Sequence, residues 1–237
     1  MKTNTDKISV VIVDDHALIH KALKDMLATR DDMLVVGEGW RGEDVFRLMD
    51  EHHPKVLILD LRMPQYNDIS RSERFDVIPS LARLNEEYPE TAVIILSQYV
   101  NYAFAQAAID HGVRSYLLKD DQLSLNILEA IDTVLIGRTL FSREINDLLF
   151  SSVPEGLNSV ALSDRQLEIV RTLVRSPEKS NQQLAADLHI AESTFKGHLN
   201  KIFTILDVPN RSTLVIRSLQ ARLVPFHLDD RGRIVLD

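Results

Sequence analysis

Five polar side chains stand directly after apolar runs at four separate places in the chain. They are Asp14, Asp15, Asp60, Ser97 and Lys119. Each apolar run is typical of a parallel strand that is buried on both faces. Ligands of open α/β sheets bind at the carboxyl edge of such strands. We therefore expect three carboxylates, a hydroxyl and an amine to converge at one edge of a sheet.

Three carboxylates that lie close together repel one another unless a cation neutralises them. Mg²⁺ suits such an oxygen-rich cluster, because it keeps several waters while joining a few carboxylates to phosphate oxygens. A carboxylate in this setting can act as a nucleophile and form an aspartyl phosphate, whose oxygens a hydroxyl and an ammonium would bind. Taken singly, each residue is more often a turn, a cap or a solvated strand end; Asp14 and Asp15 could simply cap a following helix.

Alternating strand and helix patterns must position these side chains. Strand-like runs occupy residues 8–14, 33–37, 56–60, 93–97 and 113–118, and helical spacing marks 16–30, 41–52, 77–87, 103–111 and 123–136. This alternation predicts right-handed βαβ units, and hence an α/β doubly wound five-stranded parallel sheet. The polar segment 64–76 interrupts the alternation and is predicted to be an extended loop.

Periodicity fades after residue 137 and returns as a group of helices. We predict a short helix within 143–150 and four further helices at 164–175, 180–188, 193–206 and 211–222, the first of these four capped by Ser163. The expected domains are the α/β domain at 1–137, a linker at 138–160, an all-α domain at 161–222 and a tail at 223–237. Two strand-like runs flank Asp-Asp-Arg-Gly in the tail, which is a hairpin signal.

The helix predicted at 193–206 has the pattern of a helix that enters the major groove of DNA. Its apolar residues form one stripe, and its remaining face carries five polar residues. These are Thr194, Lys196, His198, Asn200 and Lys201. Amide and amine groups near a helix N-terminus suit base edges and phosphates. The alternative is a helical protein-interaction module with a solvated basic face.

Composition restricts the chemistry further. The chain has 237 residues, 45% of them hydrophobic, and no cysteine, which excludes disulfides and thiolate metal sites. No apolar stretch has the length of a signal peptide core or a membrane span, so we expect a cytoplasmic protein. The net charge of −8 is uneven, because residues 160–222 carry 9 basic against 6 acidic side chains. No glycine-rich turn follows the first strand, which argues against a dinucleotide site.

The first domain resembles the receiver domain of two-component response regulators. The motifs are V-D-D at 13–15, L-D-L-R-M-P at 59–64, I-I-L-S at 94–97 and Y-L-L-K at 116–119. The resemblance covers about residues 6–136 and implies a flavodoxin-like fold. It also implies that Asp60 accepts a phosphoryl group from a sensor histidine kinase.

The same resemblance assigns roles to the residues around Asp60. It implies that Mg²⁺ is held by Asp14, Asp15, Asp60 and the backbone carbonyl of Arg62. Ser97 matches the switch hydroxyl, Tyr116 the rotating aromatic ring, and Lys119 the amine that contacts the phosphoryl group.

The last domain resembles the LuxR/NarL-type DNA-binding module over about residues 160–222. The matching residues are L-S-D-R at 162–165, Glu168, T-F-K-G-H at 194–198, Lys201-Ile202 and Leu206. The resemblance implies that Lys196 and Asn200 approach bases, and that Thr194, His198 and Lys201 lie nearer phosphates. The helix at 211–222 matches the family's dimerisation helix. Double-stranded DNA, a second copy of the chain and RNA polymerase are the implied partners.

Together these patterns predict a DNA-binding transcriptional regulator, not an enzyme, switched by phosphorylation of Asp60. Departures keep an alternative open: Gln98 follows Ser97 where a small residue is usual, and the loop 64–76 is long, with Asp68 where a glycine is customary. They favour a pseudo-receiver that dimerises and binds DNA without phosphate. An aspartyl-phosphate phosphotransferase of similar fold is a third interpretation, and it would leave the last domain unexplained. In that domain, Phe195 replaces a smaller aliphatic residue.

Overall fold

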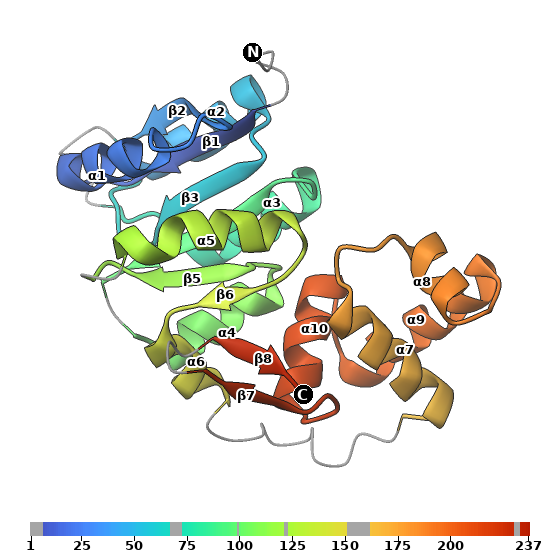
Figure 1. Cartoon of the computed structure of the whole chain (residues 1–237). Coiled ribbons are helices and arrows are strands. Elements are labelled where there is room, and N and C mark those ends of the chain that lie inside the picture. The colour runs from blue at the N-terminus through green and yellow to red at the C-terminus, as the bar shows by residue number, and fades with distance from the viewer. Residues whose placement is uncertain (1–6, 67–72, 99, 121–122, 151–161, 230–232) are drawn as a thin grey trace.

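The computed structural model describes residues 7–66, 73–98, 100–120, 123–150, 162–229 and 233–237 (Figure 1). Its N-terminal part contains a six-stranded parallel sheet in the order β2-β1-β3-β4-β5-β6. The strands are β1 Ile8–Val13, β2 Met33–Gly39, β3 Val56–Asp60, β4 Ala92–Ser97, β5 Ser115–Leu118 and β6 Leu140–Phe141. The five predicted strands are therefore all present, with the strand order of a doubly wound fold.

Five helices cover the two faces of this sheet. They are α1 Ala17–Leu27, α2 Gly42–His52, α3 Val77–Glu87, α4 Tyr102–Asp110 and α5 Leu123–Leu135. Alternate residues of a strand point to opposite faces of the sheet. In β1, Val10 and Ile12 belong to the apolar cluster under α1 and α5. Val11 and Val13 belong to the cluster under α2, α3 and α4. Both faces of the central strands are thus buried, as their continuous apolar sequences predict.

The sixth strand lies in the segment predicted to be a linker. β6 pairs in parallel with β5, so that Ser115 stands opposite Leu140 and Tyr116 opposite Phe141. The helix α6, Arg143–Phe150, follows directly. Two residues are too few to show strand periodicity, so the sequence pattern could not reveal β6. The prediction of five strands was short by one, and the domain limits themselves remain predictions.

The ends of the predicted extended loop 64–76 pair with each other. The amide of Gln65 donates to the carbonyl of Glu73 at 2.9 Å, and the amide of Phe75 donates to that of Met63 at 3.0 Å. Phe75 is buried in the core. The two described ends of the loop therefore lie side by side, and the first of them accepts hydrogen bonds from the amides of Gly42 and Glu43 at the start of α2. Asp68 lies outside the described residues.

Four helices and a hairpin form the C-terminal part. The helices are α7 Asp164–Arg175, α8 Asn181–Asp187, α9 Glu192–Leu206 and α10 Arg211–Gln220, and the strands β7 Phe226–Leu228 and β8 Ile234–Leu236 pair antiparallel. Ser163 caps α7 in a capping box with Gln166, as predicted. A second capping box, from Ser180 to Gln183, begins α8. Among the described residues, no helix is both long and apolar enough to cross a membrane.

Candidate functional site

The predicted acidic pocket forms at the carboxyl edge of the sheet. Asp14 and Asp60 are buried, with exposed fractions of 1% and 4%. The amine of Lys119 lies between them, 2.6 Å from Oδ2 of Asp14 and 2.9 Å from Oδ1 of Asp60. Asp15 stands beside them and is about one quarter exposed. Three strand ends that are distant in sequence thus bring the predicted carboxylates and amine together.

Burial dominates the electrostatics of Asp60. The pKa of its carboxyl group is raised, chiefly because burial penalises the charged form, and the neighbouring Asp14 carboxylate adds to this effect. The ammonium of Lys119 and the backbone amide of Leu61 act in the opposite direction. The charged form of Asp60 is therefore destabilised in this site, and additional positive charge nearby would stabilise it.

This imbalance predicts that Asp60→Asn stabilises the protein at neutral pH in EDTA. The pKa of Asp60 is higher in the folded than in the unfolded state, so its ionisation costs stability above the folded pKa. That cost disappears as the pH falls through the raised pKa towards about 4, the ordinary value for aspartate. Urea unfolding at pH 7 and pH 4.5 should therefore show a gain that shrinks on acidification. Exposed Asp25→Asn is the control, and a variant less stable than wild type at pH 7 would contradict the prediction.

His16 joins this pocket, although the sequence patterns did not single it out. Its Nδ1 atom lies 2.6 Å from Oδ1 of Asp15 and 3.2 Å from Oδ1 of Asp14. Its backbone amide donates to the same Asp14 oxygen at 2.9 Å. Asp14 thus supports the start of α1, while its other oxygen contacts Lys119. The only sequence signal for His16 is its position immediately after Asp14 and Asp15.

The donor atoms fit a hard divalent cation. One ligand atom each from Asp14, Asp15, His16 and Asp60 falls within 4.8 Å of the others. Three of these four residues offer carboxylate oxygens, the ligands that Mg²⁺ prefers. Such a pocket is typical of the magnesium sites of receiver domains. The contribution of the Arg62 backbone carbonyl, which follows β3, remains a prediction.

Ser97 and Tyr116 lie next to the pocket and are hydrogen-bonded to each other through their side chains. Both are buried, and burial raises the pKa of the Tyr116 phenol, while the bond to Ser97 opposes that rise. The amide of Lys119 donates to the carbonyl of Ser97 at 2.7 Å, which ties the ends of β4 and β5 together. Gln98 is exposed, and Tyr99 lies outside the described residues.

The second predicted site lies on α9. Its apolar stripe is buried and consists of Phe195, Leu199, Ile202 and Leu206. Four of the five predicted DNA-facing residues are exposed, whereas His198 is half-buried. The exposed ones are Thr194, Lys196, Asn200 and Lys201. Phe195 is fully buried, so its ring packs in the core and not on the polar face of α9.

The two sites are connected through α10, which packs against α4 and α6 (Figure 1). Seven of its ten residues are buried. The Thr213 hydroxyl donates to the Ile109 carbonyl at 3.1 Å, and Gln220 donates to the side chain of Gln106 at 2.8 Å. One apolar cluster runs from the sheet through α10 into the C-terminal helices. The helix predicted to mediate dimerisation is therefore covered by the first domain.

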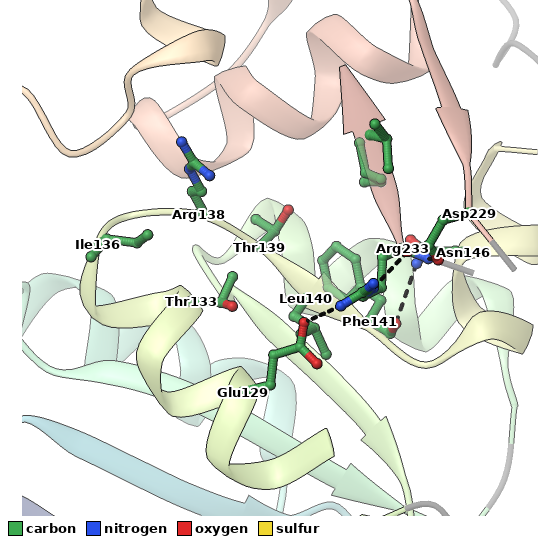
Figure 2. Close-up of a pocket in the computed structure, with 12 residues that line it drawn as sticks. Glu129, Thr133, Ile136, Arg138, Thr139, Leu140, Phe141, Asn146, Asp229 and Arg233 are labelled. Atoms are coloured by element: carbon green, nitrogen blue, oxygen red, sulfur yellow. Dashed lines mark hydrogen bonds and ion pairs between the residues drawn. The ribbon is translucent and has the colours of Figure 1, made fainter. Parts of the chain in front are cut away.

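The C-terminal hairpin adds a second connection, shown in Figure 2. Arg233 reaches from the hairpin to Glu129 of α5, with 2.7 Å between Nη1 and Oε1. On the other strand, the ring of Phe226 packs edge-on against Phe150 of α6, with 5.2 Å between centroids. A cavity of about 250 Å³ remains between the hairpin, α5 and β6. The tail thus joins the two parts of the chain, a role that its sequence did not reveal.

Comparisons with known proteins match both parts of the chain. The family model "Response regulator receiver domain" matches residues 10–131, and "Bacterial regulatory proteins, luxR family" matches residues 160–218. Response regulator protein VraR of Staphylococcus saprophyticus is 28% identical over 218 residues, which cover 92% of this chain and 99% of VraR. VraR of Staphylococcus aureus is 27% identical over the same length.

Solved structures share the fold. The response regulator RcsB of Salmonella typhimurium superimposes with a TM-score of 0.53 at 21% identity, covering 89% of this chain and 97% of RcsB. A structure of two RcsB dimers bound to two parallel DNAs gives a TM-score of 0.52 at 20% identity, covering 88% of this chain and 96% of the matched chain. The receiver match alone spans just over half of the chain, and the luxR match covers the helices around α9. This protein therefore belongs to the response regulators of the NarL/LuxR type, in which a receiver domain precedes a LuxR-type DNA-binding domain.

Proposed function

We propose that this response regulator controls transcription by binding DNA, and that phosphorylation of Asp60 by a sensor histidine kinase switches it. The arrangement that carries the proposal is the buried Asp60 carboxylate, 2.9 Å from the Lys119 amine and beside Asp14 and Asp15. Asp60 supplies the nucleophile, and Lys119 and Ser97 are placed to bind the oxygens of an attached phosphoryl group.

The residues of the pocket have different roles in the phosphoryl transfer. A carboxylate oxygen of Asp60 attacks phosphorus, the bond from phosphorus to the donor histidine nitrogen breaks, and the histidine takes up a proton. Asp14, Asp15 and Asp60, with the Arg62 carbonyl, would hold Mg²⁺, which neutralises charge on the phosphoryl oxygens when bound. Lys119 must then turn from the Asp14 carboxylate towards the phosphoryl group.

The hydrogen bond between Ser97 and Tyr116 supports a route from the pocket to α10. A phosphoryl group that attracts the Ser97 hydroxyl would withdraw it from Tyr116 and change the packing between β5 and α4. The α4 residues Gln106 and Asp110 contact Gln220 and Arg217 of α10. Phosphorylation would therefore shift an existing equilibrium from docked to released α10.

Release of α10 would permit the protein to dimerise on paired DNA half-sites. In such a dimer, Lys196 and Asn200 of α9 would approach bases. Phosphates would lie nearer Thr194, His198 and Lys201. The dimeric DNA complexes solved for RcsB support this arrangement by analogy. RNA polymerase is the partner through which a bound dimer would act on transcription.

The test combines gel-shift and sizing measurements on wild type and Asp60→Asn, each with Mg²⁺ and a small-molecule phosphodonor. We expect the donor to raise the DNA affinity of wild type by about 5–150-fold, the usual range of an allosteric coupling, and to leave Asp60→Asn unchanged. Equal affinity and equal oligomeric state of both proteins would remove Asp60 from the mechanism.

A pseudo-receiver that binds DNA without phosphate is the second candidate. The observation that favours it is that the carboxylates already have partners within the chain: the Lys119 amine contacts Asp14 and Asp60, and His16 contacts Asp14 and Asp15. Intact mass after incubation with acetyl phosphate and Mg²⁺ separates the two candidates. A gain of one phosphoryl group supports the phosphorylated switch, and no gain, together with tight DNA binding, supports the pseudo-receiver.

Gly197 offers a test of how closely α9 approaches DNA. A Cβ atom built at this position meets nothing within 4 Å, so packing does not require glycine there. We expect Gly197→Ala to raise the free energy of unfolding by about 0.5–1 kcal/mol, because glycine inside a helix is unfavourable. Weaker DNA binding by this more stable protein, measured by gel shift, would indicate that the DNA backbone needs the space. A loss of stability would contradict the prediction.

A further inference from the structure

A polar cleft of about 570 Å³ lies between the receiver domain and the C-terminal helices. Its walls come from the residue before β5, the end of α5, α7, the segment that leads from α7 into α8, and the start of α10. Leu135, Leu173 and Val215 contribute apolar surface, and two arginines, Arg114 and Arg211, contribute charge. The volume falls in the range of small-molecule sites, about 300–1,000 Å³. Neither the phosphorylation pocket nor the DNA-facing side of α9 includes these residues.

Arg114 belongs to the receiver domain but reaches α10. Its Nε atom donates to the Ser212 hydroxyl at 3.0 Å, and its Nη1 atom donates to the Val134 carbonyl at 3.2 Å. Both partners are neutral. The guanidinium is thereby fixed in orientation, but it forms no direct ion pair with an acid among the described residues.

Arg211, the first residue of α10, also lines the cleft. Its Nη1 atom donates to the Lys179 carbonyl at 3.0 Å, and its Nη2 atom to the Pro177 carbonyl at 3.3 Å. These partners are also neutral. The nearby amine of Lys179 is paired with Asp187 at 2.7 Å and contributes little net charge.

Neither arginine therefore has a direct ion pair within the described part of the chain. Among the described residues, no carboxylate lies within 4 Å of either guanidinium, although Glu90 and Glu178 stand exposed at the rim of the cleft. Burial lowers the pKa of both side chains, and the charge of Arg114 lowers that of Arg211 further; Glu90 and Glu178 oppose these shifts of Arg114 and Arg211, respectively, without reversing them. Partly buried charges are normally paired, and two cations facing one cleft are the arrangement that an anion would stabilise.

We propose that this interdomain cleft binds a small phosphate-bearing ligand through Arg114 and Arg211. A guanidinium carries five N–H donors, so each arginine keeps N–H groups beyond those bound to its neutral partners, and these can donate to phosphate oxygens. The orientation of each group is already set by its neutral partners, which lowers the entropy cost of binding. The apolar walls and the volume leave room for an organic group beyond the phosphate itself.

The position of the cleft gives such a ligand a regulatory consequence. Arg114 moves with the receiver domain and Arg211 with α10, so an anion held by both would favour the docked arrangement. By linkage, the ligand would oppose whatever releases α10. The cleft would thus let a phosphate compound reduce DNA binding independently of Asp60.

The experiment uses the full chain in EDTA without a phosphodonor, at constant ionic strength set with chloride. Calorimetric titration and the thermal unfolding midpoint are measured with inorganic phosphate and, separately, with phenyl phosphate. We expect both probes to bind wild type and to raise its midpoint. Arg114→Gln and Arg211→Gln should each weaken binding by about tenfold or more, the effect of losing hydrogen bonds to a charged group.

Four further variants make the result specific. Lys196→Gln on α9 and Arg47→Gln on α2 should keep the full response, and Arg114→Lys, which retains the charge, should keep a reduced one. Tighter binding of phenyl phosphate assigns the cleft to an organic phosphate, and tighter binding of inorganic phosphate assigns it to the free ion. No binding by wild type, or an equal response in all variants, would overturn the proposal. Asp60→Asn should bind both probes like wild type, so this result is separate from the phosphorylation test.

Discussion

Replacing Lys119 with methionine is expected to lower the free energy of unfolding by about 3–5 kcal/mol in EDTA at neutral pH. The amine is only 4% exposed and contacts both Asp14 and Asp60. Methionine keeps much of the volume but leaves two buried carboxylates without a counterion. Removing one partner of a buried ion pair is far more harmful than losing an exposed pair, because the remaining charge cannot be hydrated.

Urea unfolding with and without Mg²⁺ would measure this effect. The cation should restore part of the lost stability, because it binds the folded carboxylates and not the unfolded chain. Lys24→Met is the matched control: its amine pairs with Glu38 at 3.0 Å but is 46% exposed, so its loss should cost less than about 1 kcal/mol. In the double variant with Asp60→Asn, the penalty should shrink, since one of the two charges is gone. A cost below about 1 kcal/mol for Lys119→Met would refute the idea that this amine holds the pocket together.

The acidic pocket was predictable because strand ends follow a simple geometric rule. Parallel strands place their carboxyl ends at one edge, so Asp14, Asp60 and Lys119 had to meet once the strands were recognised. His16 followed no such rule, since its side chain turns back towards the carboxylates from the first position before α1. β6 also escaped prediction, because its two residues are strand only through pairing with β5. A sequence pattern reveals only those strands and helices that are long enough to show a periodicity. Shorter elements form through tertiary pairing and leave no such pattern.

The contact between the two parts of the chain could not be derived from sequence for a related reason. α10 is buried on more than one side, so the face it turns to α4 carries Thr213, Arg217 and Gln220 as well as apolar residues. Polar residues on a helix normally predict a solvated face. Here they form hydrogen bonds to α4 that satisfy them in the interface. A helix that is predicted to pair with its copy in a dimer can thus pack against another helix of its own chain. Activation would then require α10 to leave α4 and to bind the α10 helix of a second copy.

The tail hairpin should therefore influence DNA binding strongly. We expect Phe226→Ala to raise the DNA affinity of the unphosphorylated protein by about 5–150-fold, the range of typical coupling free energies. Phe226 is 9% exposed, packs on Phe150 of α6, and lies under the Arg222 guanidinium, 4.7 Å from the ring centroid. Removing a buried aromatic ring costs about 3–5 kcal/mol, and here that cost falls on the docked arrangement, because the ring joins the tail to the receiver side.

Gel shift without phosphodonor would measure the affinity, and small-angle scattering would report whether the two parts separate. His227→Ala is the matched control, since the neighbouring side chain is 61% exposed on the opposite face of β7 and pairs with the exposed Asp237 carboxylate. Circular dichroism must show that both variants remain folded. If Phe226→Ala binds DNA like wild type and stays equally compact, the hairpin does not restrain α10. If its affinity rises and the phosphodonor adds little more, the tail and Asp60 act on the same equilibrium, because a helix already released cannot be released again.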